Sequence, residues 1–168
     1  MTNNYDLVYY CDSYSAIGNG HLKRGIDILN YLSYKNEDLH LALMGKFSKN
    51  AKNFINLFLN NNVEINENAK SDVLVLDTMF EPGNPDFINK NFCDELKTRT
   101  KRLIMINSGM NLIIPGSIDV LIDHLPNVNI SGNQKCKKFI GFDFSPVSNE
   151  FYTNNKVKQG DNLLFVIG

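Results

Sequence analysis

Hydrophobic residues along this chain form short continuous runs that alternate with stretches of helical spacing. The short runs are rich in β-forming residues and predict strands at residues 5–11, 39–44, 73–77, 103–106 and 120–122. Apolar positions at helical spacing predict helices at residues 21–34 and 51–59. A further helix is predicted at residues 85–98, after a break in the chain that is rich in proline and glycine. Strands with continuous apolar runs are typical of sheets covered on both faces. The alternation therefore predicts an α/β fold with a doubly wound, mostly parallel sheet.

The end of the chain differs in composition from the rest. Residues 1–145 hold the predicted elements and are expected to form one Rossmann-like domain. Residues 146–160 are polar, begin with a proline and have the composition of a linker. Residues 161–168 (DNLLFVIG) have the pattern of a strand entering a glycine turn, where the sequence stops. We therefore expect them to be the first strand of a second domain that is missing from this chain.

Composition and charge narrow the range of partners. A net charge of −1 and a pI near 6.3 give no basic excess for a phosphate backbone, so nucleic acid is not an expected partner. No apolar stretch is long enough to span a membrane and the first residues are polar, which predicts a cytoplasmic protein. The three cysteines are far apart, and no His, Cys and carboxylate cluster is evident. We expect no metal and no cofactor.

The loop after the first predicted strand has the residues expected of a ligand site. Ligands of doubly wound sheets bind at the carboxyl ends of strands, where this loop lies. Gly18 and Gly20 lack a Cβ atom, so the backbone there can adopt positive φ and approach a ligand closely. His21 then begins a helix, whose positive end favours the neutral imidazole that a general base requires. Asp12 either binds a sugar hydroxyl or steadies the loop through its own backbone, and Asn19 lies between the two glycines.

Three further polar residues belong to the predicted site. Asp77 follows a buried strand directly, and a carboxylate there is costly unless it faces the crevice or is paired. Arg24 lies one helical turn after His21 and either orients it, meets a phosphate or is solvated. Asn107 follows the strand predicted at residues 103–106 and therefore lies at the same edge of the sheet.

Two common glycine motifs can be excluded. A dinucleotide fingerprint would need a third glycine where Lys23 stands, and no acidic residue follows the second predicted strand at Gly45 and Lys46. The chain also contains no Walker-type phosphate loop. NAD binding is therefore disfavoured, and P-loop ATP hydrolysis is excluded for this chain.

The residues Gly18-Asn-Gly-His-Leu-Lys-Arg24, with Asp12 and Ile17 upstream, read G-x-G-H-x-x-R. This motif resembles the UDP-sugar hydrolase of the pseudaminic acid pathway. That family belongs to the GT-B superfamily and is related to the glycosyltransferase that makes lipid II from lipid I. The apolar strand ending at Asp77 and the residues Leu163 to Gly168 are also similar to segments of the family.

The resemblance implies a function in surface-glycan or nonulosonic acid biosynthesis. His21 would be the base that activates water to attack the anomeric carbon of a UDP-linked deoxyamino sugar and expel UDP. The chain would be the amino-terminal half of a GT-B fold, and the missing second domain would bind most of the nucleotide. The residues expected to bind the UDP-sugar are Asp12, Gly18, Asn19, Gly20, Arg24, Asp77 and Asn107.

The chain departs from the family pattern at two places. Asn107 and Ser108 replace a pair of aspartates, and the aspartate-x-tyrosine turn of the family here reads Asp77-Thr-Met-Phe80. These departures leave two alternatives open. One is a GT-B glycosyltransferase in which His21 deprotonates a sugar or lipid-linked acceptor. The other is a sugar-binding domain without catalytic activity.

Overall fold

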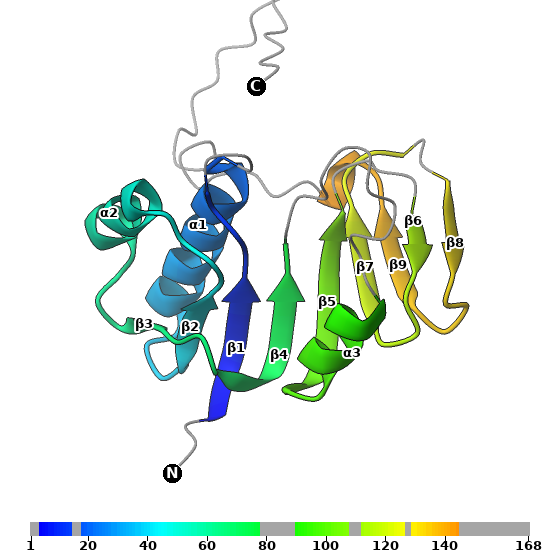
Figure 1. Ribbon diagram of the computed structural model, residues 1–168, viewed down its shortest axis with the longest axis horizontal. Coiled ribbons are helices and arrows are strands. Elements are labelled where there is room, and N and C mark those ends of the chain that lie inside the picture. The colour runs from blue at the N-terminus through cyan, green and yellow to red at the C-terminus, as the bar shows by residue number, and fades with distance from the viewer. Residues whose placement is uncertain (1–3, 15–17, 78–89, 108–111, 127–128, 145–168) are drawn as a thin grey trace, which may run out of the picture.

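The computed structural model describes residues 4–14, 18–77, 90–107, 112–126 and 129–144, without the side chain of Phe142. Within these residues, seven strands form one sheet in which every pairing is parallel (Figure 1). The strands, in spatial order, are β3 (Val63–Ile65), β2 (Leu41–Met44), β1 (Asn4–Tyr10), β4 (Lys70–Leu76), β5 (Thr100–Asn107), β7 (Val120–Asp123) and β9 (Lys137–Ile140). The predicted parallel α/β sheet of the Rossmann-like type is confirmed.

Helices cover both faces of this sheet, as a doubly wound fold requires. Helices α1 (Gly20–Lys35) and α2 (Lys49–Phe58) pack on one face, where Leu22, Ile26 and Leu29 of α1 are almost fully buried. Helix α3 (Lys90–Lys97) packs on the opposite face with the other half of the core. The wide apolar stripe of α1 explains this burial, because residues at helical spacing share one side of the helix.

The order of the strands creates a switch point between β1 and β4. The chain runs outward from β1 through β2 to β3 and then crosses back to place β4 on the other side of β1. In sheets of this kind, the crevice for a ligand lies outside the carboxyl ends of the two strands where the order reverses. The carboxyl ends of β1 and β4 lie at the same level, because Tyr10, the last residue of β1, pairs with Leu76, the last residue of β4.

The structure contains four strands that the hydrophobic pattern did not predict. These are β3, β9 and a separate parallel pair formed by β6 (Leu112–Ile114) and β8 (Ile130–Gly132). The strands are three or four residues long, and few of their side chains are buried. Strand β9 holds Lys137 and Lys138, both exposed, at the edge of the large sheet. Lysines suit such an edge because they discourage pairing with other chains.

The predicted helix at residues 85–98 is confirmed in part, because α3 covers Lys90–Lys97 and residues 85–89 lie outside the described residues. In the described residues after α3, the connections between strands of the large sheet contain no α-helix. Strand β6 lies there instead, and its Leu112 and Ile114 join the same core as α3. No helix in the described ranges is both long and apolar enough to cross a membrane.

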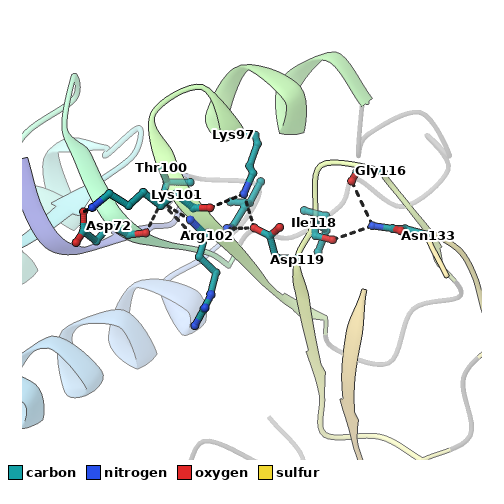
Figure 2. Close-up of polar contacts among 10 residues, drawn as sticks. Asp72, Lys97, Thr100, Lys101, Arg102, Gly116, Ile118, Asp119 and Asn133 are labelled. Carbon is teal, nitrogen blue, oxygen red and sulfur yellow. Dashed lines mark hydrogen bonds and ion pairs between the residues drawn. The ribbon is translucent and has the colours of Figure 1, made fainter. Parts of the chain in front are cut away.

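The amino-terminal edge of the sheet is fixed by a network of polar contacts (Figure 2). The carboxylate of Asp119 accepts hydrogen bonds from Lys97 Nζ at 2.5 Å and from the backbone N–H of Leu103 at 2.7 Å. The amide of Asn133 donates to backbone carbonyls in residues 116–118. These contacts join α3, β5 and the segment before β7. Their donors and acceptors satisfy one another, which is the pattern of a structural network.

Candidate functional site

Polar side chains meet at the carboxyl ends of β1 and β4, which lie side by side at the switch point (Figure 1). The pairing of the strands continues one residue beyond β4, because the N–H of Asp77 donates to the carbonyl of Tyr10 at 2.9 Å. The position of Asp77 is therefore fixed by the sheet. Helix α1 begins beside this edge and presents His21 and Arg24, one turn apart, to the same carboxylate.

Asp77 is fully buried and accepts four hydrogen bonds. Its Oδ1 atom lies 2.8 Å from Nδ1 of His21 and accepts from a terminal nitrogen of Arg24 at 2.6 Å. Its Oδ2 atom accepts from Nε of Arg24 at 2.7 Å and from the hydroxyl of Tyr9. Two oxygens provide about four acceptor positions, so this carboxylate is saturated by the protein itself.

The contacts of Asp77 decide its charge. Burial raises the pKa of this carboxyl, but hydrogen bonds from His21 and Arg24 and the charge of Arg24 outweigh burial, so the pKa lies below its ordinary value. For Arg24, burial opposes the charged form, but the hydrogen bond and charge of Asp77 prevail and raise its pKa. Asp77 and Arg24 therefore form an ionised pair with bidentate geometry, which is the strong form of such a pair.

The arrangement selects one tautomer of His21. Nδ1 lies 2.8 Å from Oδ1 of Asp77 and 3.0 Å from a terminal nitrogen of Arg24. If Nδ1 carried no proton, its lone pair would face the carboxylate oxygen at that distance. The contact to Asp77 is shorter than the contact to Arg24, whose nitrogen can only donate, so the arrangement favours the tautomer with the proton on Nδ1, donated to Asp77. In this tautomer Nε2 is the proton acceptor of the ring. The side chain of His21 is 13% exposed, so it is not sealed inside the core.

Tyr9 is a member of this site that the sequence pattern did not reveal, because a tyrosine in β1 fits simple core packing. Its ring is completely buried and its hydroxyl donates to Asp77. Burial, followed by the charge of Asp77, raises the pKa of Tyr9, so the hydroxyl stays protonated and remains a donor. The sequence gives only a general indication of this role: a tyrosine in a buried strand usually needs a hydrogen-bond partner for its hydroxyl.

The Tyr9 ring packs directly against Gly25 of α1. A Cβ atom built on Gly25 would lie 2.7 Å from two ring carbons of Tyr9. We expect Gly25→Ala to destabilise the fold by up to about 2 kcal/mol, because an overpacking cost of about 1–3 kcal/mol is only partly offset by a gain of about 1 kcal/mol in helix propensity. Denaturant unfolding measures this change. Gly20→Ala is the matched control in the same helix, since its Cβ would meet open space; equal stability of the two variants would contradict the prediction.

The loop between β1 and α1 is closed by its own polar groups. Gly18 has φ of +71°, which confirms the positive φ expected there, and the hydroxyl of Ser13 lies 2.9 Å from its carbonyl and 2.6 Å from Oδ1 of Asn19. Gly20 does not have positive φ, so that expectation was wrong: it is the first residue of α1, and an ordinary helical conformation suffices. Gly18, Asn19 and Gly20 are exposed. Ile17 lies outside the described residues.

Asp12 joins the loops that follow β1 and β2. Its Oδ1 atom accepts from the backbone N–H of Lys46 at 2.8 Å and from the Tyr10 hydroxyl at 3.2 Å. Asp12 thus steadies its loop through the backbone of the neighbouring loop and not, as was expected, through that of its own loop, and its contact with a sugar stays a prediction. The two loops approach closely at Gly45, a residue whose role the sequence pattern did not reveal. Its φ is +150°, and a Cβ there would lie 1.8 Å from the carbonyl oxygen of Cys11.

The structure does not bring Asn107 together with the His21 group. Ile106 packs in the core beneath α1, so Asn107, the next residue of β5, points to the opposite face of the sheet. There Asn107 is fully buried and donates to Oδ2 of Asp123 at 2.5 Å. A carboxylate at the end of β7 is thus its partner, and the role of Asn107 in binding a sugar stays a prediction.

Comparisons with protein-family models, with curated proteins and with solved structures found no match to this chain. Among the described residues, no group of three or more His, Cys, Asp or Glu side chains is placed to hold a metal ion. The fold and the site together define a Rossmann-like α/β protein in which a histidine is oriented by a buried aspartate at the switch point of the sheet.

Proposed function

We propose that this chain is the base-bearing half of a sugar-nucleotide hydrolase that cleaves a UDP-linked deoxyamino sugar. The observation that carries the proposal is the contact between Nδ1 of His21 and the buried carboxylate of Asp77, at 2.8 Å, which leaves Nε2 able to accept a proton. The resemblance of the Gly18 to Arg24 motif to hydrolases of the pseudaminic acid pathway supports the choice of substrate and a place in surface-glycan or nonulosonic acid biosynthesis.

In the proposed reaction, Nε2 of His21 removes a proton from water as the water oxygen attacks the anomeric carbon. The bond between that carbon and the phosphate oxygen breaks, and UDP leaves with the bonding electrons. The proton ends on the imidazole, whose Nδ1 keeps its hydrogen bond to Asp77, as a carboxylate holds the histidine of a serine hydrolase in place. A single displacement inverts the configuration at the anomeric carbon.

The other proposed site residues divide into two groups. Gly18, Asn19 and Gly20 are exposed at the start of α1, where backbone N–H groups and the positive end of the helix suit an anionic ligand. Arg24 and Asp77 are paired with each other, so we assign them to holding His21 rather than to contacting the sugar. The nucleotide would be bound mainly by a further domain, of which residues 161–168, outside the described residues, would be the start.

Hydrolysis in H₂¹⁸O tests the proposal. In a version of the protein that includes the proposed nucleotide-binding domain, we expect release of UDP and a free sugar that carries ¹⁸O on the anomeric carbon with inverted configuration. The 168-residue chain alone should release negligible UDP if, as proposed, a second domain binds most of the nucleotide. Incorporation of ¹⁸O into UDP would contradict attack at carbon. Release of UDP only with an added sugar or lipid-linked acceptor would favour a glycosyltransferase instead.

A further inference from the structure

Arg24 contacts both Asp77 and His21. Its Nε and a terminal nitrogen bind the two oxygens of Asp77 at 2.7 and 2.6 Å, and the same terminal nitrogen lies 3.0 Å from Nδ1 of His21. The side chain of Arg24 is only 19% exposed and that of Asp77 is fully buried. Charges at such distances interact strongly when little water separates them. The charge of Arg24 therefore acts on the imidazole as well as on the carboxylate.

A buried carboxylate beside an imidazole creates a difficulty for a general base. The negative charge of Asp77 favours the protonated ring, and a protonated ring cannot accept a proton from water. Arg24 cancels that charge at nearly the same place. The other titratable groups facing Asp77 are Tyr9 of β1 and Cys11, the residue that follows β1, and burial raises the pKa of each, so both stay uncharged. Arg24 is thus the cation placed to balance Asp77 among the described residues.

We propose that Arg24 is a positioning residue that keeps His21 unprotonated by neutralising Asp77 while it orients the carboxylate toward Nδ1. This inference rests on the proposed function, because only a proton-accepting role requires the neutral ring. Of the three roles open to Arg24, its contacts support orientation of His21 rather than a phosphate contact or a solvated position.

The test is a measurement of the protonation state of His21 in the 168-residue chain. Nitrogen-15 NMR of the imidazole distinguishes charged from neutral rings, and comparison with His21→Gln identifies the signal among the three histidines. At pH 7, Arg24→Gln should raise the ratio of charged to neutral His21 about tenfold or more. Lys23→Gln is the matched control, since Lys23 is an exposed cation in the same turn that pairs with Asp27. It should leave the ratio unchanged.

A second variant keeps the test decisive if Arg24→Gln does not fold. Arg24→Lys retains the positive charge but cannot bind both oxygens in the same fork. Its ratio of charged to neutral His21 should stay within about threefold of the wild type. A tenfold rise in Arg24→Lys would overturn the proposal, because charge would then not be the controlling property. An unchanged ratio in folded Arg24→Gln would overturn it equally.

The pH profile of UDP release, measured on a version of the protein that includes the proposed nucleotide-binding domain, separates this inference from the proposed function. Arg24→Gln should move the acidic limb of the profile to higher pH, so that activity lost at neutral pH returns in alkaline solution. A purely structural role of Arg24 would lower the rate at every pH. If the NMR ratio rises as expected but the wild type releases no UDP, the proposed function fails and the role of Arg24 stands. If UDP is released but the ratio of charged to neutral His21 does not change in Arg24→Gln, the proposed role of Arg24 fails and the proposed function is retained.

Discussion

Replacing His21 with alanine is expected, under the proposed function, to lower the rate of UDP release at least about 100-fold in a version of the protein that includes the proposed nucleotide-binding domain, because that is the usual scale of a general base. The structure gives the physical reason. Nδ1 of His21 is held by the buried carboxylate of Asp77, so Nε2 is the ring atom that would accept the proton of water in the proposed reaction. Without the imidazole, water must attack without a base. Steady-state assay of UDP at saturating substrate measures the change.

The matched control for this experiment is His40→Ala. His40 is an exposed histidine just before β2, at the opposite end of the sheet from the site, so its removal should leave the rate of UDP release unchanged. Unfolding curves of both variants should be recorded, because a folded His21→Ala protein is needed to assign the loss to chemistry. Near-normal release by folded His21→Ala would remove His21 from the mechanism.

The parts of the site that could be predicted are those that depend on local sequence. The loop after β1 was recognised from Gly18 and His21, because glycines between a strand and a helical pattern are typical of a ligand-binding loop. Asp77 was recognised because a carboxylate after a buried apolar run needs a partner or a crevice to face. For Arg24 the sequence left several roles open. The structure shows the pairing with Asp77, which lies 53 residues away in the chain.

The parts that could not be predicted depend on contacts between distant segments. Tyr9 looks like an ordinary strand residue until the fold places Asp77, 68 positions later, beside its hydroxyl. Asn107 was expected beside His21 because both follow strands of one sheet. The alternation of side chains along β5 turns Asn107 to the other face, and a shift of one residue is enough to reverse that outcome. Strand boundaries read from hydrophobicity are not accurate to one residue.

Replacing Asp77 with alanine should destabilise the chain strongly, by about 3 kcal/mol at neutral pH. The substitution leaves the guanidinium of Arg24 and the hydroxyl of Tyr9 without the acceptor that each has in the wild type. Both groups are largely removed from water, so solvent cannot fully replace the lost hydrogen bonds. Chemical denaturation of the wild type and the variant at pH 7 measures the difference in free energy of unfolding.

The difference in free energy of unfolding between wild type and Asp77→Ala should also depend on pH, and the direction of this dependence can be predicted. The folded state holds the pKa of Asp77 below its ordinary value, so the ionised carboxylate stabilises the fold above the unfolded pKa of about 4. As the pH falls through the lower folded value, Asp77 is protonated in both states and that contribution is lost. The gap between wild type and Asp77→Ala should therefore be largest near neutral pH and should narrow in acid.

Asp72→Ala is the matched control, because Asp72 belongs to the same strand β4 and pairs with Lys101 at 2.8 Å (Figure 2). The two side chains of that pair are 45% and 77% exposed, so water replaces the contact and the substitution should change stability little. The contrast isolates burial as the cause, since both variants remove an aspartate that is paired with a cation. Two results would contradict the prediction: equal stability of the Asp72 and Asp77 variants, or a stability difference between wild type and Asp77→Ala that does not change between pH 7 and acid. Either would show that the buried pair of Asp77 and Arg24 does not stabilise the carboxyl-terminal edge of the sheet.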